Sequence, residues 1–234
     1  LRMSRGLGDV YKRQMKHIAL LTTLLLSASL QAVEKPYDYV FFENSLMKGD
    51  YFYSQAKYTS PSWIKNARHH LPVAGSVAFT PGNSLELTYV SAPGGDWYSE
   101  IQYCPVRGND FFREPSTLSL QVQLRESMNA AALPNIAIRY ADSTYTQYLN
   151  LRNYLKDTRP GVWHSVSIPL KDFGLNAVND TNIKKLAAVA LRPGTADGNE
   201  YTIYLDDIEL LPASLPSVSC LLYTSDAADE LDGV

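Results

Sequence analysis

Apolar and polar residues alternate with a period of two along much of the chain. Four segments show this alternation most clearly: residues 85–89, 118–124, 136–140 and 162–168. Successive side chains of a β-strand point to opposite faces, so each segment predicts a strand with one buried face. Similar but shorter patterns predict five further strands, at residues 39–42, 97–104, 146–151, 184–191 and 201–210.

Turn-forming residues separate the predicted strands. They include Pro81-Gly82-Asn83, Pro93-Gly94-Gly95, Pro160-Gly161, Pro193-Gly194 and Asp197-Gly198. Many short strands with one apolar face each are typical of an all-β fold, and we predict an antiparallel β-sandwich. No long helical period interrupts the pattern, although residues 62–68 could form one short helix.

The two ends of the chain are related to each other through their coding sequences. Residues 9–14 and 220–225 can be encoded by DNA segments that are reverse complements apart from the outermost bases. This pair resembles the translated adapter of a transposase-based sequencing library, and a natural inverted repeat is the alternative. We interpret residues 1–14 and 220–234 as adapter sequence and exclude them from the fold analysis. On this interpretation the gene continues past Ser219, and a downstream domain is missing.

A secretory signal peptide is predicted at residues 15–32. It starts at Met15 with a short polar head, continues with an apolar run over residues 18–26, and ends in small residues before a cleavage site after Ala32. The run is too short for a membrane span, and no cysteine follows it for lipid attachment. We therefore expect a secreted or periplasmic protein. One β-sandwich domain is predicted at residues 33–211, followed by a proline-containing linker at residues 212–219.

The charge and amino-acid composition of the chain indicate which classes of binding partner suit it. The chain has 21 basic and 24 acidic residues and no basic patch, which argues against nucleic acid. Cys104 is the one cysteine outside the adapter segments, so no disulfide is expected within the domain, and we interpret Cys104 as a small buried hydrophobe. Tyrosine is counted 16 times, against 7 phenylalanines and 3 tryptophans. Tyrosine is a good strand former, but its apolar ring and polar tip also suit recognition surfaces.

Three motifs occur in a characteristic order. Residues 41–43 read Phe-Phe-Glu, residues 163–173 read Trp-His-Ser-Val-Ser-Ile-Pro-Leu-Lys-Asp-Phe, and residues 201–210 read Tyr-Thr-Ile-Tyr-Leu-Asp-Asp-Ile-Glu-Leu. Together they resemble the opening strand, a strand with its loop, and the closing strand of jelly-roll carbohydrate-binding modules of the galactose-binding-like class. More loosely, residues 42–49, 79–83 and 107–111 are similar to domains that lead secreted glycan-degrading proteins of Bacteroidetes type.

The resemblance implies a structural Ca²⁺ between the first and last strands, with Glu43, Asp206 and Asp207 at the matching positions. Calcium binds six to eight or so oxygen ligands, mainly carboxylates and carbonyls. Neighbouring strand residues point to opposite faces, so one of the two aspartates is expected to ligate, and Asp207 is preferred. The apolar phase changes between Leu205 and Ile208, which predicts a local bulge. Alternatively, both carboxylates are solvated or capped by backbone N–H groups.

A polar strand face is the candidate sugar-binding surface. Counting alternate residues collects Tyr98, Glu100, Gln102, Gln121, Gln123 and Arg139, with Tyr148 or Gln147 joining according to register. Amides, carboxylates and guanidinium groups can bridge vicinal hydroxyls, and aromatic rings can stack on a pyranose. The alternative is an ordinary solvent-facing sheet, which is polar in any case.

Loop residues offer a rival location for a sugar. Trp97 follows a glycine turn and could form an exposed platform, but it shares the strand phase of Ile101, which favours the core. Arg107 and Asp110 flank a glycine and could clamp a ligand or form a surface ion pair of little energetic value.

Catalysis is poorly supported by the motifs. No nucleophile elbow, phosphate loop or metal-ligand spacing occurs, and Asp206 and Asp207 would point away from each other, unlike the paired carboxylates of a glycosidase. We therefore predict a non-catalytic module that binds a poly- or oligosaccharide and holds it near a downstream catalytic domain. Two alternatives remain. One is a spacer that packs on the catalytic domain without affinity for sugar. The other is a jelly-roll lyase or hydrolase, which would need Glu86, Glu100 and Arg139 to line one groove.

Overall fold

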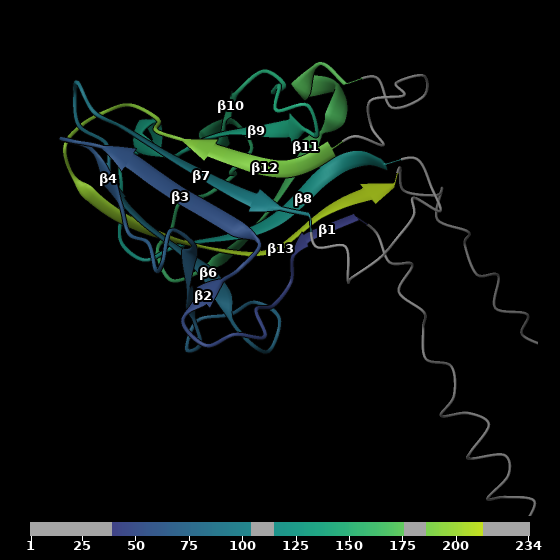
Figure 1. Ribbon diagram of the computed structural model, residues 1–234, viewed down its shortest axis with the longest axis horizontal. Helices are drawn as coiled ribbons and strands as arrows, with labels where there is room; N and C mark the ends of the chain where they lie inside the picture. The colour runs from purple at the N-terminus through teal and green to yellow at the C-terminus, as the bar shows by residue number, and fades with distance from the viewer. Residues whose placement is uncertain (1–38, 104–114, 176–185, 213–234) are drawn as a thin grey trace, which may run out of the picture. The chain divides into compact units, whose positions relative to one another are not determined.

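Two antiparallel sheets make up the computed structural model, which describes residues 39–103, 115–175 and 186–212 (Figure 1). Within these residues the larger sheet has eight strands: β1 (Tyr39–Phe42), β2 (Asp50–Tyr51), β4 (Trp63–Ile64), β5 (Leu71–Ala74), β6 (Ser84–Val90), β8 (Pro115–Leu124), β11 (Trp163–Pro169) and β13 (Glu200–Pro212). The smaller sheet has five: β3 (Ser54–Thr59), β7 (Asp96–Gln102), β9 (Asn135–Tyr140), β10 (Leu149–Asn150) and β12 (Leu186–Arg192). The predicted antiparallel β-sandwich is confirmed.

Strand order determines which side chains become neighbours. The larger sheet runs β11-β8-β13-β6-β5-β2, with β1 paired to β13 and β4 paired to β6. The smaller sheet runs β10-β9-β12-β7-β3. Strands that are close in sequence, such as β7 and β8, therefore belong to different sheets. The first and last strands lie side by side, with Tyr39 opposite Leu210.

The hydrophobic core lies between the two sheets. The larger sheet contributes the inward side chains of Leu85, Leu87, Leu118, Leu120, Val122, Ile203 and Leu205, and the smaller sheet contributes those of Trp97, Ile101, Ile136, Ile138, Val189 and Leu191. All of these side chains are buried. Their partners in the alternation face outward, so the period-two pattern in the sequence correctly separates the core from the two outer faces.

The predicted bulge in the closing strand is also confirmed. The register of β13 against β8 shifts between Asp206 and Glu209, and Asp207 adopts a φ of 45°. Aspartate tolerates this left-handed region better than most residues. One extra residue in β13 therefore changes which residues face the core.

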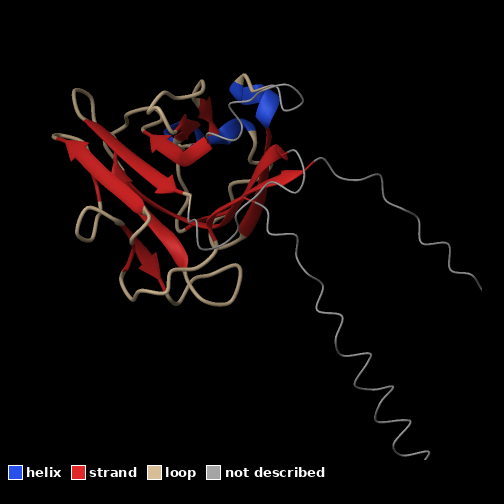
Figure 2. Ribbon diagram, turned by 45° about the vertical axis from the view of Figure 1, so that its right-hand side comes forward, coloured by secondary structure: helices blue, strands red, loops and turns tan. Residues whose placement is uncertain are grey.

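Helical structure is limited to three short 3-10 turns in the described segments (Figure 2): η2 (Ala130–Ala132), η3 (Leu151–Asn153) and η4 (Leu170–Phe173). The prediction that residues 62–68 could form a short helix is wrong, because Trp63 and Ile64 form strand β4 and pair with β6. Of the strand predicted at residues 146–151, only β10 is formed. The strand ends there because the Asn150 side chain accepts a hydrogen bond from the Arg152 N–H and starts η3. No helix in residues 39–103, 115–175 or 186–212 is long and apolar enough to span a membrane.

Candidate functional site

The outer face of the smaller sheet gathers tyrosines and paired charges. On β7, Tyr98, Glu100 and Gln102 alternate with the buried Trp97 and Ile101 and so face away from the core. Arg139 on β9 and Arg192 on β12 face the same side, and Tyr145 and Tyr148 come from the segment between β9 and β10. We call Tyr98, Glu100, Arg139, Tyr145, Tyr148 and Arg192 the tyrosine face.

A buried ion pair crosses the strand at the centre of this face. Arg139 Nε lies 2.7 Å from Glu100 Oε1, an ion pair whose angle does not suit a hydrogen bond. The two residues stand on β9 and β7, which flank β12 on either side. On β12 the outward residues beneath the pair are Ala188 and Ala190, whose side chains are short enough to let the long ones meet above them. The side chains of Arg139 and Glu100 are only 15% and 4% exposed, so each charge depends on the other.

Tyrosine hydroxyls surround the same carboxylate. The Tyr145 hydroxyl donates to Glu100 Oε1 at 2.9 Å. The Tyr98 side chain lies near Glu100 and Tyr145, and both influence its ionisation. Burial, reinforced by the nearby Glu100 carboxylate, raises the pKa of Tyr98 well above its ordinary value. Tyr98 therefore stays protonated and keeps its hydroxyl as a hydrogen-bonding group.

Ionisation of Tyr98 and Tyr148 is not expected to affect ligand binding at the tyrosine face between neutrality and about pH 10, the ordinary pKa of tyrosine. Burial raises the pKa values of Tyr98 and Tyr148, so neither hydroxyl ionises in this range. A spectrophotometric titration should show these two tyrosines ionising after the exposed ones. Early ionisation of a tyrosine that disappears in the Tyr98→Phe variant would contradict this assignment.

Arg192 joins two of the tyrosines. Its guanidinium carbon lies 5.6 Å from the centre of the Tyr98 ring and 5.8 Å from that of Tyr148, within cation–π range. Arg192 Nε donates to the Tyr148 hydroxyl at 3.2 Å, and Nη1 pairs with Asp96 Oδ2 at 3.0 Å. Tyr145 and Tyr148 stack with their ring centres 6.0 Å apart. The rings are therefore held in place by one another and by Arg192.

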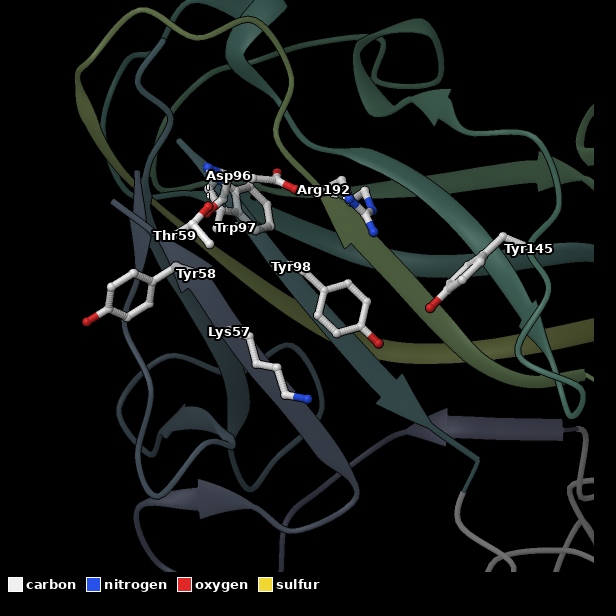
Figure 3. Close-up of a pocket in the computed structure, with 8 residues that line it drawn as sticks. All are labelled: Lys57, Tyr58, Thr59, Asp96, Trp97, Tyr98, Tyr145 and Arg192. Carbon is white, nitrogen blue, oxygen red and sulfur yellow. Dashed lines mark hydrogen bonds and ion pairs between the residues drawn. The ribbon is translucent and has the colours of Figure 1, made fainter. Parts of the chain in front are cut away.

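A hollow of about 400 Å³ opens on this face (Figure 3). Its lining residues are Lys57, Tyr58, Thr59, Asp96, Trp97, Tyr98, Tyr145 and Arg192. Tyr98 and Tyr145 extend into the same space from different elements. The walls combine aromatic carbon, hydroxyl groups, the ion pair of Asp96 with Arg192 and the Lys57 ammonium group. This combination suits a polar ligand whose hydroxyls can exchange hydrogen bonds with these groups.

Glycine allows one wall of the hollow to close tightly. Gly95 directly precedes β7 and lies against the turn between Thr59 and Ser62. A Cβ atom on Gly95 would come within 2.2 Å of the Ser62 backbone nitrogen. The glycine turn noted in the sequence therefore brings the start of β7 against β3 and its turn.

The structure brings together four of the predicted sugar-binding residues: Tyr98, Glu100, Arg139 and Tyr148. Gln102 lies on the same face of β7, opposite Ala188. Within the tyrosine face, Glu100 and Arg139 are mostly buried, whereas Tyr98 and Tyr145 line the hollow. Tyr148 contacts two residues of the lining, Tyr145 and Arg192.

Three of the predicted sugar-binding residues lie elsewhere than expected, and a fourth is outside the residues that the structure describes. Gln121 and Gln123 face outward from β8, which belongs to the larger sheet, so they are not part of the tyrosine face. Trp97 is 1% exposed and donates from Nε1 to Ser91 Oγ, so it packs in the core and is no exposed platform. Arg107 lies outside the described residues.

The groove required by the lyase or hydrolase alternative is not formed by the predicted residues. Glu86 lies on β6 of the larger sheet and pairs with Lys65 at 2.7 Å. Glu100 and Arg139 lie on the smaller sheet and pair with each other. The three side chains therefore do not line one groove.

Sequence reasoning missed Tyr145, Arg192, Asp96 and Lys57. Arg192 could have been found, because it continues the outward phase of Ala188 and Ala190 along β12. Tyr145 follows β9 in an irregular segment and joins it only through a bridge to Arg139, so no periodicity marks it.

The acidic residues of the predicted calcium site are engaged in other contacts. Asp206 Oδ2 accepts hydrogen bonds from the backbone N–H groups of Phe79 and Thr80, and Oδ1 accepts one from Asp207. Asp207 Oδ2 accepts from the Thr80 hydroxyl at 2.7 Å. Glu43 directly follows β1, and in the described part of the chain no three acidic, histidine or cysteine side chains form a metal-binding group. These residues fit a capped carboxylate better than a calcium site, and calcium binding stays a prediction.

Known proteins share both the sequence and the fold. An exo beta-1,2-glucooligosaccharide sophorohydrolase (non-reducing end) of Parabacteroides distasonis is 98% identical over 207 residues, which cover 88% of this chain but 29% of that protein. The crystal structure of a beta-1,2-glucanase from the same species matches with 98% identity and a TM-score of 0.75, over 79% of this chain and 26% of that one. The chain thus spans less than a third of either relative.

A more distant match is a family 30 carbohydrate-binding module of a cellulosomal cellulase of Clostridium thermocellum. It is 18% identical with a TM-score of 0.55, over 75% of this chain and 97% of that module, and it shares the fold. The family model for carbohydrate binding domain 30 matches residues 38–211, which is nearly the whole predicted β-sandwich domain. The chain therefore belongs to the carbohydrate binding domain 30 family.

Proposed function

We propose that the tyrosine face binds a β-linked glucan and holds it near the catalytic part of a longer, secreted glycoside hydrolase. The single observation that carries this proposal is the hollow lined by three tyrosines, Tyr58, Tyr98 and Tyr145, beside the ion pair of Asp96 with Arg192. Pyranose rings can stack on the tyrosine rings, and sugar hydroxyls can exchange hydrogen bonds with the tyrosine hydroxyls. The sophorohydrolase relative is named for β-1,2-gluco-oligosaccharides, so β-1,2-glucan is the proposed ligand.

The role of such binding is tethering. A module that binds glucan weakly still raises the local concentration of substrate around an attached catalytic domain. The domain downstream of the predicted linker would supply the catalytic residues. The signal peptide predicted at residues 15–32 supports export of the whole protein to where the polysaccharide is found.

Replacing Tyr148 by alanine is expected to weaken glucan binding about tenfold or more. The variant loses the ring that stacks on Tyr145 and the hydroxyl that accepts from Arg192, so both partners lose their fixed positions. Migration in native gels that contain soluble β-1,2-glucan measures the change. Tyr145→Phe, which removes only the hydroxyl bonded to Glu100, is expected to produce a smaller loss.

The matched control is Phe52→Ala. Phe52 is a 62% exposed aromatic in the turn between β2 and β3, and it does not line the hollow. Its removal should leave migration in the glucan gel unchanged. Equal migration of Tyr148→Ala, Phe52→Ala and the unsubstituted chain would contradict the proposal.

A structural spacer is the second candidate function, and one observation favours it. Leu46 and Met47, in the loop between β1 and β2, are 97% and 46% exposed. Large contiguous patches of exposed apolar side chains mark surfaces that are covered by another protein part, and a spacer would include these two residues in its covered surface. For a pure spacer, no glucan would retard the chain in a gel, and Leu46→Ser would lower the melting temperature only in the longer protein that includes the catalytic domain.

A further inference from the structure

A row of side chains crosses the outer face of the larger sheet. The register places Trp163 of β11 opposite Gln123 of β8, Gln123 opposite Tyr204 of β13, and Tyr204 opposite Glu86 of β6. All four alternate with buried core residues and therefore face away from the core. Neighbouring strands are about 4.8 Å apart, so three strand intervals give this row a length of about 14 Å. We call these four residues the Trp163 row.

A second aromatic ring adjoins one end of the row. The Phe79 ring packs edge-on against Trp163 with ring centres 5.9 Å apart and an interplanar angle of 68°. Phe79 remains 48% exposed, although its backbone N–H is fixed by a 2.8 Å hydrogen bond to Asp206. Two aromatic side chains thus present carbon surface beside the amides of β8.

The one charged side chain in the row is neutralised by an ion pair. Glu86 is paired with Lys65 at 2.7 Å. Gln121, one step along β8, accepts a hydrogen bond from Ser165, and the Gln123 amide donates to the Gly161 carbonyl at 3.3 Å. Among the described residues no donor to the Gln123 carbonyl oxygen is found, so this oxygen can accept a hydrogen bond from a ligand. A ligand at this row meets amides and hydroxyls but no excess charge.

Tyr204 brings a hydroxyl group to the middle of the row. Its side chain lies in the middle of the row and only 9% of the residue is exposed. Among the described residues no hydrogen-bond partner is found for its hydroxyl, and this atom is not one of the fully buried unpartnered polar atoms, so water or a ligand can reach it. A ligand laid along the row would bring hydroxyl groups to this atom.

We propose that the Trp163 row is a second carbohydrate-binding surface, which takes the same class of β-linked glucan as the tyrosine face. This inference rests on the proposed function for the identity of its ligand. Aromatic rings beside amides, a paired carboxylate and a free hydroxyl match the alternating apolar and hydroxyl-bearing surfaces of a glucan. An apolar protein partner fits less well, because Gln123 and the paired Glu86 are polar and the one exposed aliphatic side chain next to the row in the described residues is Val162. The two surfaces lie on opposite sheets, so one chain could hold two glucan strands.

Isothermal titration with a soluble β-1,2-gluco-oligosaccharide tests the second surface. The unsubstituted chain is expected to bind about two oligosaccharides. Trp163→Ala and Phe79→Ala should each reduce this to about one, as should Tyr148→Ala on the other sheet. Tyr204→Phe removes one hydroxyl without changing packing and should weaken one of the two sites about threefold to tenfold, the range for a single hydrogen bond.

Phe52→Ala is again the matched control and should retain both sites. Single-site binding that is lost in Tyr148→Ala but unchanged in Trp163→Ala, Phe79→Ala and Tyr204→Phe would overturn the second surface and leave the proposed function intact. Single-site binding that is lost in Trp163→Ala and Phe79→Ala, weakened in Tyr204→Phe and unchanged in Tyr148→Ala would confirm the second surface and move the binding function away from the tyrosine face. No binding by the unsubstituted chain would overturn both.

Discussion

Arg139→Ala is expected to lower the free energy of unfolding by about 3 kcal/mol, the lower end of the cost of breaking a buried ion pair. The substitution leaves Glu100, whose side chain is 4% exposed, without its positive partner in a place that water reaches poorly. For a domain of this size the melting temperature should fall by roughly 6–12 °C. Thermal denaturation followed by circular dichroism measures the change.

A double substitution separates stability from binding. Glu100→Gln together with Arg139→Met removes both charges and keeps side chains of similar length, so most of the lost stability should return. Glucan binding should not return fully, because the Tyr145 hydroxyl then loses its bond to a charged carboxylate. An Arg139→Ala variant with the melting temperature of the unsubstituted chain would show that the Glu100 carboxylate has an unrecognised partner.

Asp206→Ala is expected to lower the free energy of unfolding by about 3 kcal/mol as well. The Asp206 side chain is fully buried, and its carboxylate accepts hydrogen bonds from the backbone N–H groups of Phe79, Thr80 and Asp207. Removing the acceptor leaves buried donors unsatisfied, at a cost of roughly 1–3 kcal/mol each before water enters. Chemical denaturation of the variant and of the unsubstituted chain gives the difference.

Asp207→Asn serves as the control for this experiment. Asparagine tolerates the φ of 45° at this position and keeps an oxygen that can accept from the Thr80 hydroxyl, so little stability should be lost. If Asp207→Asn proved as destabilising as Asp206→Ala, the carboxylate cap on residues 79–80 would not be the stabilising feature.

The pH dependence of stability should reflect the titration of the Asp206 carboxyl group. Burial raises the pKa of Asp206 to about 6, although hydrogen bonds from the N–H groups of Phe79 and Asp207 act in the opposite direction. The folded chain then holds this proton more tightly than the unfolded chain, whose aspartate titrates near about 3.9. The stabilising contribution is complete below about pH 4 and is lost as the pH rises through about 6. Asp206→Ala should flatten this part of the stability profile.

The sequence was most informative about which side chains of a strand face the core and which face outward. Because alternation depends only on the strand, it correctly placed Tyr98 and Glu100 outward and predicted the bulge after Asp206. The same pattern said nothing about which sheet each strand joins. Gln121 and Gln123 were therefore grouped with Tyr98, although β8 crosses to the other sheet.

Residues outside regular strands were the hardest to foresee. Tyr145 and Tyr148 reach the tyrosine face from an irregular segment, where only tertiary contacts with Glu100 and Arg192 determine their positions. The short strands β2, β4 and β5 carry too few residues for a period to show, and their existence depends on pairing with neighbours. In each case the missing information is a contact between segments far apart in the sequence.

The pairing of the first and last strands has a mechanical consequence. Tyr39 and Leu210 are opposite each other in an antiparallel pair, so the domain begins and ends at one place on its surface. A pulling force applied between these two ends would peel β1 from β13 one residue pair at a time. A force that runs from a glucan-bound face to the end of β13 instead loads the long ladders with β8 and β6 lengthwise, where many hydrogen bonds share the strain. We therefore expect the module to resist a pull from a bound polysaccharide better than stretching between its own ends.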